Sequence, residues 1–270
     1  MLQSIRDIRA GVKVHHPLIH CITNPISINQ CANTILAVGA RPIMAEHPGE
    51  VCEITGTAGA LMLNLGNITD VRMESMRRAA QTAKDGGIPI LLDAVGVACS
   101  RMRRDYACSI IKTAAPAVIK GNYSEINALY HEAYRAAGVD ADAALSGCEM
   151  DRVCVALARS YRSTILASGK VDIVTDGTRL FHIKNGTPQL SEITGTGCML
   201  GALAAAYLTT TPGAEAAAAA CAVMGICGQC AQTERGGGSF LVNLMDALST
   251  IKDEDIEKCL DMEEIEIEGL

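Results

Sequence analysis

The chain has 270 residues, of which 49% are hydrophobic and 20% charged, and its formal net charge is −7. This length suits one large α/β domain or two small ones, and the composition is ordinary for a soluble globular protein. An acidic chain with no tryptophan and two phenylalanines lacks the basic field and the aromatic platforms that nucleic-acid binding uses. We therefore expect no nucleic-acid partner.

Charged residues occur within the first seven positions and no apolar run follows them, so no secretory signal is predicted and a cytoplasmic location is expected. Two charge-free windows, Ile193–Ala214 and Ala216–Thr233, are long enough to raise the question of a membrane span. Alanine dominates both windows, and Gly, Pro and Thr interrupt them. They are therefore predicted to be buried helices, with no membrane partner.

The twelve cysteines are scattered singly through apolar runs, which is typical of reduced cysteines in a core. Cys227 and Cys230 have the spacing of a redox pair, but they lie in an alanine-rich helical pattern that no strand precedes. We interpret most of the cysteines as small hydrophobic residues. The histidines show no spacing typical of a zinc site.

Apolar runs of strand length alternate with helical patterns along most of the chain. The predicted strands are Pro17–Thr23, Arg41–Ala45, Ala60–Gly66, Ile88–Asp93, Ala117–Asn122 and Thr164–Gly169, then a hairpin of Asp172–Gly177 and Arg179–Ile183. The predicted helices are Ser27–Val38, one from Pro48, one from Thr69 to Gly86, one opening at Asn122, Asp151–Tyr161, one opening in Ile193–Leu200, Ala214–Gln232 and Phe240–Leu248. A short amphipathic segment precedes them, Glu132–Glu149 is predicted to be a linker or insertion, and the acidic tail Asp253–Glu268 a solvated surface.

This alternation predicts one doubly wound, mostly parallel α/β/α domain over residues 1–270, since no repeat or composition break divides the chain. Polar residues follow several of the predicted strands, at the edge where open α/β sheets bind ligands. They are Asn24, Asn64, Asp93, Lys120, Asn122 and Ser168. Local chemistry leaves alternatives open, because Asn24 or Asp93 could form turns, Lys120 could be solvated, and Met44 could be a core residue.

The stretch Ile193–Leu200 closes a glycine-rich turn and opens a helix. Gly195 and Gly197 allow the backbone to approach a ligand closely, and the first free N–H groups of the helix form an anion site. Cys198 lies in the first helical turn, where the helix dipole favours a thiolate. The alternative is an ordinary loop. A phosphate site at this edge favours phosphoryl transfer, although both common nucleotide-binding motifs are absent.

Five segments resemble the hydroxyethylthiazole kinase family, a ribokinase-like group of thiamine salvage. They are Pro17–Val51, Leu92–Val97, Ile119–Ile126, Val174–Gly177 and Ile193–Leu200. The combination of C-I-T-N, M-A-E and T-G-T-G-C-M-L is specific, because ribokinase-like relatives usually carry aspartate where this chain has Cys198.

The resemblance implies a ribokinase-like three-layer α/β/α fold and transfer of the ATP γ-phosphoryl group to the hydroxyl of 4-methyl-5-(2-hydroxyethyl)thiazole, with Mg²⁺. It also implies a homotrimer with active sites between subunits. The implied roles are thiazole binding by Met44, Asn24 and Gly195; ATP binding by Lys120, Ser168 and Asn122; metal organisation by Asp93 and Glu125; and an anion hole at Gly195, Gly197 and Cys198.

Two roles stay open in this reading. Cys198 either acts as the general base or only shapes the anion hole. Glu125 either reaches Mg²⁺ through water or forms a capping box at the start of its helix.

The chain departs from the family pattern at four positions: Lys120 replaces arginine, Ser168 replaces threonine, and Ala94 and Gly237 replace prolines. Lysine loses the two-pronged grip of arginine on phosphate, so these changes bear on ATP affinity more than on reaction type. Alternatives to the thiazole substrate are a kinase for another small alcohol such as hydroxymethylpyrimidine, a nucleotide-dependent dehydratase, and a binding protein for thiazole or nucleotide without turnover.

Overall fold

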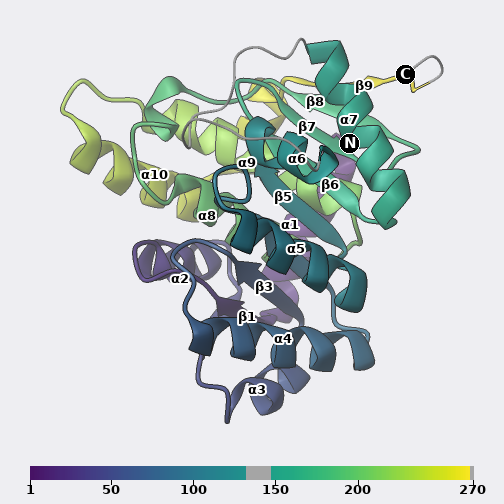
Figure 1. Ribbon diagram of the computed structural model, residues 1–270. Helices are drawn as coiled ribbons and strands as arrows, with labels where there is room; N and C mark the ends of the chain where they lie inside the picture. The colour runs from purple at the N-terminus through teal and green to yellow at the C-terminus, as the bar shows by residue number, and fades with distance from the viewer. Residues whose placement is uncertain (132–146, 268–270) are drawn as a thin grey trace.

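A computed structural model describes residues 1–131 and 147–267 of the chain. Its centre is a nine-stranded sheet in the order β2-β1-β3-β4-β5-β6-β7-β8-β9 (Figure 1). The strands are β1 (Leu18–Ile22), β2 (Arg41–Ile43), β3 (Ala60–Asn64), β4 (Ile90–Asp93), β5 (Val118–Asn122), β6 (Thr164–Ser168), β7 (Asp172–Thr175), β8 (Leu180–Ile183) and β9 (Met262–Ile265).

Helices cover both faces of this sheet. They are α1 (Leu2–His15), α2 (Ile28–Ala37), α3 (Val51–Thr57), α4 (Asp70–Asp85), α5 (Arg101–Ala114), α6 (Tyr123–Tyr130), α7 (Gly147–Tyr161), α8 (Thr196–Tyr207), α9 (Ala214–Ala231), α10 (Gly237–Thr250) and α11 (Asp253–Cys259). Strand residues alternate between the faces, so that Met62 packs with α1, α2 and α8–α11 while Leu61 and Leu63 pack with α3–α7. The predicted three-layer α/β/α fold is confirmed.

The chain reverses its direction of travel across the sheet near β1. It first places β2 on one side of β1 and then builds β3 to β6 on the other, all in parallel. Such a reversal leaves a crevice outside the carboxyl ends of the two strands at the switch, here β1 and β3. From β6 onward the strands pair antiparallel. The switch point is therefore where a ligand site is expected.

Helix α9 is the one helix in the described ranges that is long and apolar enough to cross a membrane. Of its apolar window, 83% is buried inside the protein, which agrees with the prediction of a buried helix. Cys227 and Cys230 both lie within α9, the first buried and the second exposed. All twelve cysteines are free.

Three parts of the fold differ from the sequence-based expectation. The amphipathic opening is a full helix, α1, and α5 was not predicted at all. The prediction that Asp253–Glu268 is only a solvated surface was wrong, because Ile256 of α11 is fully buried and β9 adds a strand to the sheet beside β8. The predicted linker lies outside the described residues except at 147–149, which begin α7.

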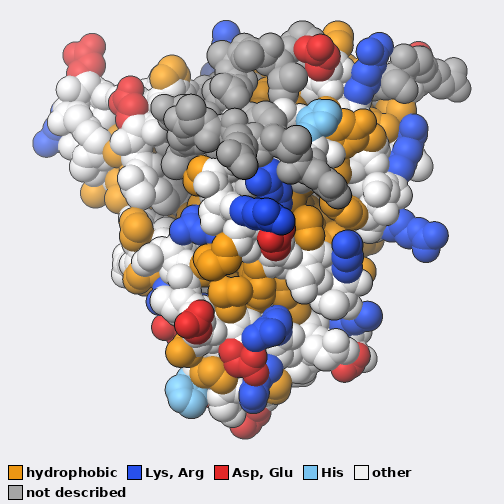
Figure 2. Space-filling view, viewed as in Figure 1, with side chains coloured by type: hydrophobic (Ala, Val, Ile, Leu, Met, Phe, Trp, Pro, Cys, Tyr) orange, Lys and Arg blue, Asp and Glu red, His pale blue; other side chains and the backbone are white. Residues whose placement is uncertain are grey.

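Figure 2 shows one face of the molecule, the one with α4 and α5 in front. Hydrophobic side chains gather there among single basic and acidic ones, and Val71 of α4 and Met102 of α5 are each more than half exposed.

Candidate active site

Three neighbouring parallel strands end in polar side chains that lie in one row. Asn64 of β3 is in register with Asp93 of β4, and Asp93 is in register with Lys120 of β5. The Asn64 amide nitrogen donates to Asp93 Oδ2 at 2.8 Å, and Lys120 Nζ donates to Asp93 Oδ1 at 3.0 Å. All three side chains are at least 95% buried. The predicted gathering of polar residues at this edge is confirmed for this row.

Asn24, which follows β1 across the switch point, joins the end of the row. Its amide nitrogen donates to Asn64 Oδ1 at 3.1 Å. Its own Oδ1 accepts from the backbone N–H groups of Ile26 and Ser27, both at 3.1 Å. Because the backbone occupies the Asn24 carbonyl oxygen, its amino group must point into the site.

The glycine turn ends directly above this row. Gly195 precedes α8 with φ of 99°, a left-handed conformation that favours glycine, and no side chain caps the helix. The Thr196 hydroxyl closes the turn by donating to the carbonyl of Leu190 at 2.7 Å. The N–H groups of the first turn of α8 are therefore available to an anion, as the sequence predicted.

Gly201 explains why α8 can lie so close to the sheet. A Cβ at that position would be 2.8 Å from Met62 Cε and 3.5 Å from Asp93 Oδ2. The ammonium of Lys120 also lies close to the turn, 3.8 Å from where a Cβ of Gly197 would be. The site thus combines backbone N–H groups with one buried cation.

Cys198 is the third residue of α8 and contacts the row from above. Its Sγ accepts from the amide nitrogens of Asn64 at 3.3 Å and Asn24 at 3.5 Å. Two N–H donors therefore converge on one sulfur atom, an arrangement that favours negative charge there.

The surroundings of Cys198 oppose that effect. Burial raises the pKa of the thiol, and the neighbouring Asp93 carboxylate raises it further. The Ser27 hydroxyl, Lys120 and Asn24 lower the pKa, but they do not outweigh burial. The helix dipole alone predicted an easily ionised thiol, whereas burial beside an acid keeps the free thiol protonated at neutral pH.

Lys120 and Asp93 form a buried ion pair. Burial disfavours the charge on Lys120, but the Asp93 carboxylate outweighs this and the pKa of Lys120 is raised to about 12. Burial raises the pKa of Asp93, and Lys120 opposes that change. The lysine therefore keeps its positive charge inside the site.

Glu125 is the second acid of the site, and it also forms the capping box that its sequence allowed. Its Oε2 accepts from the N–H of Asn122 at 2.8 Å, and Asn122 Oδ1 accepts from the N–H of Glu125 at 2.8 Å. Its Oε1 accepts from the N–H of Gly96 at 2.7 Å. Burial raises the pKa of Glu125, while these backbone bonds lower it.

These two acids fit the demands of Mg²⁺. Asp93 is close enough to raise the pKa of Glu125, and the single positive charge of Lys120 lowers the pKa of both acids. Each carboxylate oxygen already accepts one hydrogen bond, which suits acids that hold metal-bound water. No group of three metal-binding side chains occurs in the part of the chain that the structure describes. The residues fit a magnesium ion that takes its other ligands from phosphates and water.

Ser168 and Met44 lie at the two sides of the row. Ser168 is in register with Asn122, and its hydroxyl donates to the carbonyl of Gly121 at 3.3 Å. Met44 directly follows the edge strand β2, and its half-buried side chain packs against the core on the α8 side. Their roles in ATP and thiazole binding remain predictions.

The segment after Met44 is held by a histidine to which the sequence reading gave no role. His20 is fully buried in β1, with Nε2 2.9 Å from the carbonyl of Ala45 and Nδ1 2.8 Å from Thr55 Oγ1. Because a carbonyl only accepts, Nε2 carries the proton and Nδ1 accepts from threonine. Glu46 adds an ion pair with Arg72 at 2.7 Å. A histidine inside an apolar strand was the only available signal for this contact.

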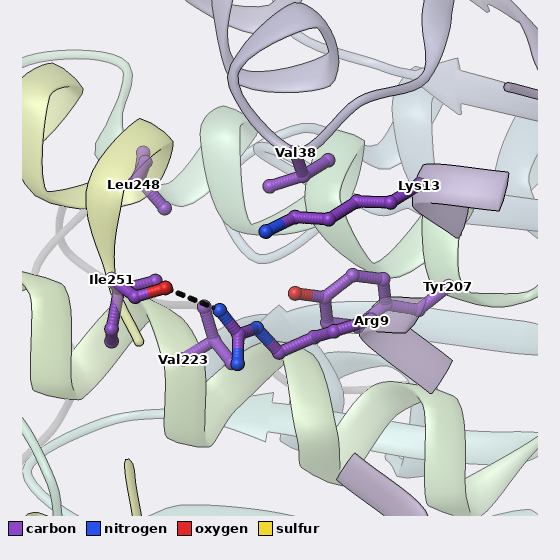
Figure 3. Close-up of a pocket in the computed structure, with 7 residues that line it drawn as sticks. All are labelled: Arg9, Lys13, Val38, Tyr207, Val223, Leu248 and Ile251. Atoms are coloured by element: carbon purple, nitrogen blue, oxygen red, sulfur yellow. Dashed lines mark hydrogen bonds between the residues drawn. The ribbon is translucent and has the colours of Figure 1, made fainter. Parts of the chain in front are cut away.

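A small cavity of about 10 Å³ lies elsewhere, among α1, α8, α9 and α10 (Figure 3). Tyr207 reaches it from the last residue of α8, so it lies at the opposite end of that helix from Cys198. Arg9 in its wall donates to the carbonyl of Ile251 at 2.5 Å and pairs with Asp253. The space suits a single water molecule and no larger ligand.

Comparison with known proteins identifies the family of the chain. The model of the hydroxyethylthiazole kinase family matches residues 10–254. Hydroxyethylthiazole kinase 2 of Clostridium botulinum (strain 657 / Type Ba4) is 47% identical over 257 residues, which cover 93% of this chain and 97% of that protein. The structure of a hydroxyethylthiazole kinase protein from Pyrococcus horikoshii OT3 superimposes with a TM-score of 0.90 at 33% identity, covering 98% of this chain and 100% of that one.

A more distant structure shares the fold alone. The pyridoxal kinase from Staphylococcus aureus has a TM-score of 0.65 at 12% identity, over 93% of this chain and 99% of that one. The family match and the similarity to the clostridial and archaeal proteins show that the chain belongs to the hydroxyethylthiazole kinase family.

Proposed function

We propose that the protein transfers the γ-phosphoryl group of ATP to the hydroxyl of 4-methyl-5-(2-hydroxyethyl)thiazole. The observation that carries this proposal is the buried row of Asn64, Asp93 and Lys120 beneath the uncapped glycine turn of α8. Phosphoryl transfer depends on positioning and on stabilising the negative charge that moves, and this arrangement supplies both.

Each group has a distinct part in the proposed reaction. The N–H groups of the Gly195–Cys198 turn and the Lys120 ammonium stabilise the oxygens of the transferring phosphoryl group. Ser168 and Asn122 contact ATP beside them. Asn24, Met44 and Gly195 hold the thiazole, with its hydroxyl directed toward the turn.

In the proposed reaction the proton of that hydroxyl leaves toward Cys198. Because its own thiol is protonated at neutral pH, it accepts this proton only in the fraction of molecules that hold the thiolate. In the other molecules it shapes the anion hole. Asp93 and Glu125 would hold the magnesium ion through its water. The chemistry that bound Mg²⁺ supplies is neutralisation of charge on the phosphate oxygens.

We propose that the working enzyme is a single-domain protomer in a cytoplasmic homotrimer with its active sites between subunits. Ile26, 61% exposed, directly precedes Ser27 beside the glycine turn. Leu36 of α2 and Val242 of α10 are 55% and 59% exposed, on two helices that pack together. Apolar side chains exposed beside a site support its being covered by another subunit.

Release of ADP by the purified protein with Mg-ATP tests the reaction. The thiazole alcohol, hydroxymethylpyrimidine and no acceptor are compared in parallel, and Asp93→Asn serves as the inactive control. We expect turnover that needs both the thiazole alcohol and Mg²⁺ and that falls at least about 10²-fold in the control. Turnover with hydroxymethylpyrimidine alone would make the protein a different small-alcohol kinase. Binding of ligand without ADP release from any acceptor would favour a binding protein or a dehydratase.

A further inference from the structure

Asn64 is the side chain that touches both Cys198 and Asp93. Its one amide nitrogen carries two hydrogens, and the distances are 2.8 Å to Asp93 Oδ2 and 3.3 Å to Cys198 Sγ. An amide nitrogen donates its two hydrogens in fixed directions within the plane of the group. One rigid group therefore sets where the sulfur lies relative to the carboxylate.

The orientation of this amide is itself fixed. Asn64 Oδ1 accepts from the N–H of Gly66 at 2.9 Å and from the amide of Asn24 at 3.1 Å. Turning the amide over would set the amino group against these two donors and the carbonyl oxygen against Asp93. Asn64 is also fully buried, so water cannot replace the lost bonds.

We propose that Asn64 is a positioning residue that holds the Cys198 sulfur and the Asp93 carboxylate in one fixed arrangement for phosphoryl transfer. This inference rests on the proposed function and assigns a role to a residue beyond those expected to contact the substrates. Asn64 lies beneath the first turn of α8 and is screened from solvent, so it acts through its two neighbours. Its loss is expected to lower kcat while KM for both substrates stays nearly unchanged.

Gly66 gives this arrangement a steric requirement. A Cβ at Gly66 would lie 2.9 Å from Asn64 Oδ1 and 2.9 Å from Asn24 Nδ2, closer than a methyl group can approach. Gly66→Ala therefore displaces the amides of Asn24 and Asn64 without replacing any side chain of the network.

Asn64→Asp is the sharpest test, because it preserves shape and the acceptor for Gly66 but replaces the two donors with a carboxylate. Asn185→Asp is the matched control. Asn185 is also buried, its amide donates to the carbonyl of Cys259 at 2.7 Å, and its Oδ1 accepts from the N–H of Asp261 at 2.8 Å, in another part of the fold. Both variants are first checked for a cooperative thermal transition.

Two measurements follow on the full-length protein. The first is kcat and KM, where Asn64→Asp is expected to lower kcat by about 10²-fold, as misplacement by an ångström does. The second is the rate at which iodoacetamide alkylates Cys198, followed by mass spectrometry against the exposed Cys52 of the same molecules. Loss of an N–H donor and gain of a charge should slow alkylation of Cys198 about tenfold and leave Cys52 unchanged. Gly66→Ala should lower both kcat and the alkylation rate of Cys198, each by a smaller factor than Asn64→Asp does.

The inference is overturned if folded Asn64→Asp keeps wild-type kcat and Cys198 reactivity, or if Asn185→Asp changes both as much. Gly66→Ala with both values unchanged would equally refute it. The alkylation rate does not depend on catalysis. If the protein showed no kinase activity, the proposed function would be refuted, but the alkylation rates would still test whether Asn64 positions Cys198.

Discussion

Two lysine–carboxylate pairs link neighbouring strands, or the residues that directly follow them, in the same sheet. They have the same chemistry but differ in distance and in burial. Lys120 and Asp93 are 3.0 Å apart, with side chains 5% and 1% exposed. Lys184 and Glu263 are closer, at 2.6 Å, but 37% and 54% exposed. Water screens the shorter pair and cannot reach the longer one. Burial, and not the distance between the charges, therefore determines how much free energy of unfolding is lost when one partner of the pair is removed.

The same contrast separates two regions of the sheet. The parallel strands β1, β3, β4 and β5 carry buried polar groups at or just after their carboxyl ends, and these groups contact one another under α8. The antiparallel strands β7 to β9 carry surface pairs, such as Arg179 with Glu264 at 2.8 Å. The polar groups of the first region form a buried network at the predicted ligand edge, whereas those of the second form solvent-exposed pairs. Three experiments test this difference between the two regions.

The largest effect is expected from Lys120→Met, compared with Lys184→Met. The first substitution leaves Asp93 as a buried charge without its cation, which should lower the free energy of unfolding by about 3 kcal/mol and abolish turnover. Lys184→Met should change neither the free energy of unfolding nor the turnover measurably. Urea unfolding followed by circular dichroism gives the stabilities, and ADP release gives the activity. Equal losses in the two variants would contradict the importance of burial.

A smaller effect is expected from alanine at two glycines with similar backbone. Gly195 has φ of 99° and Gly177, in the hairpin of the antiparallel region, has φ of 88°. A side chain in this left-handed region costs about 1–2 kcal/mol, and a Cβ at Gly177 would also lie 2.8 Å from Arg159 Cγ, so both variants should lose stability and Gly177→Ala the more. Only Gly195→Ala should also lose kcat, because only that turn belongs to the proposed phosphoryl-binding site. Loss of activity in Gly177→Ala at the same stability would remove the distinction between the regions.

The smallest effect is a pH dependence that comes from His20. Burial lowers its pKa below the ordinary 6.5, so its stabilising contribution is complete above pH 6.5 and is lost as pH falls through the lower, folded value. Between these values stability should fall by at most about 1.4 kcal/mol per pH unit. His20→Gln removes this titration, and the difference between the variant and wild type in urea midpoints from pH 7.5 to 5 should therefore shrink. A constant difference over that range would argue against a buried neutral histidine.

The sequence was most informative where a single residue type ended a continuous apolar strand. Asp93 and Lys120 could be placed at the ligand edge because parallel strands end together and strongly apolar strands have few polar positions. The ionisation of Cys198 could not be predicted, because it depends on burial and on Asp93, which is 105 positions away in the sequence and meets it only through the fold.

The tail shows the same limit on a larger scale. Its local composition, rich in acids, indicates a solvated segment, and most of its side chains are indeed exposed. The order of β9 comes from backbone hydrogen bonds to β8, and that of α11 from the burial of Ile256. Because these stabilising contacts are made with residues far away in the sequence, neither α11 nor β9 shows a periodic pattern of its own.

The contact between the first and the last helices has a consequence for how the protein is made. Arg9 of α1 pairs with Asp253 of α11 and binds the carbonyl of Ile251, and Arg6 pairs with Glu257 at 2.6 Å. During synthesis the ribosome releases α1 first, and more than 230 residues must follow before these partners exist. Until then, the buried Arg9 lacks both its counter-charge and its carbonyl. The nascent chain therefore cannot complete this part of its fold before α11 has left the ribosome.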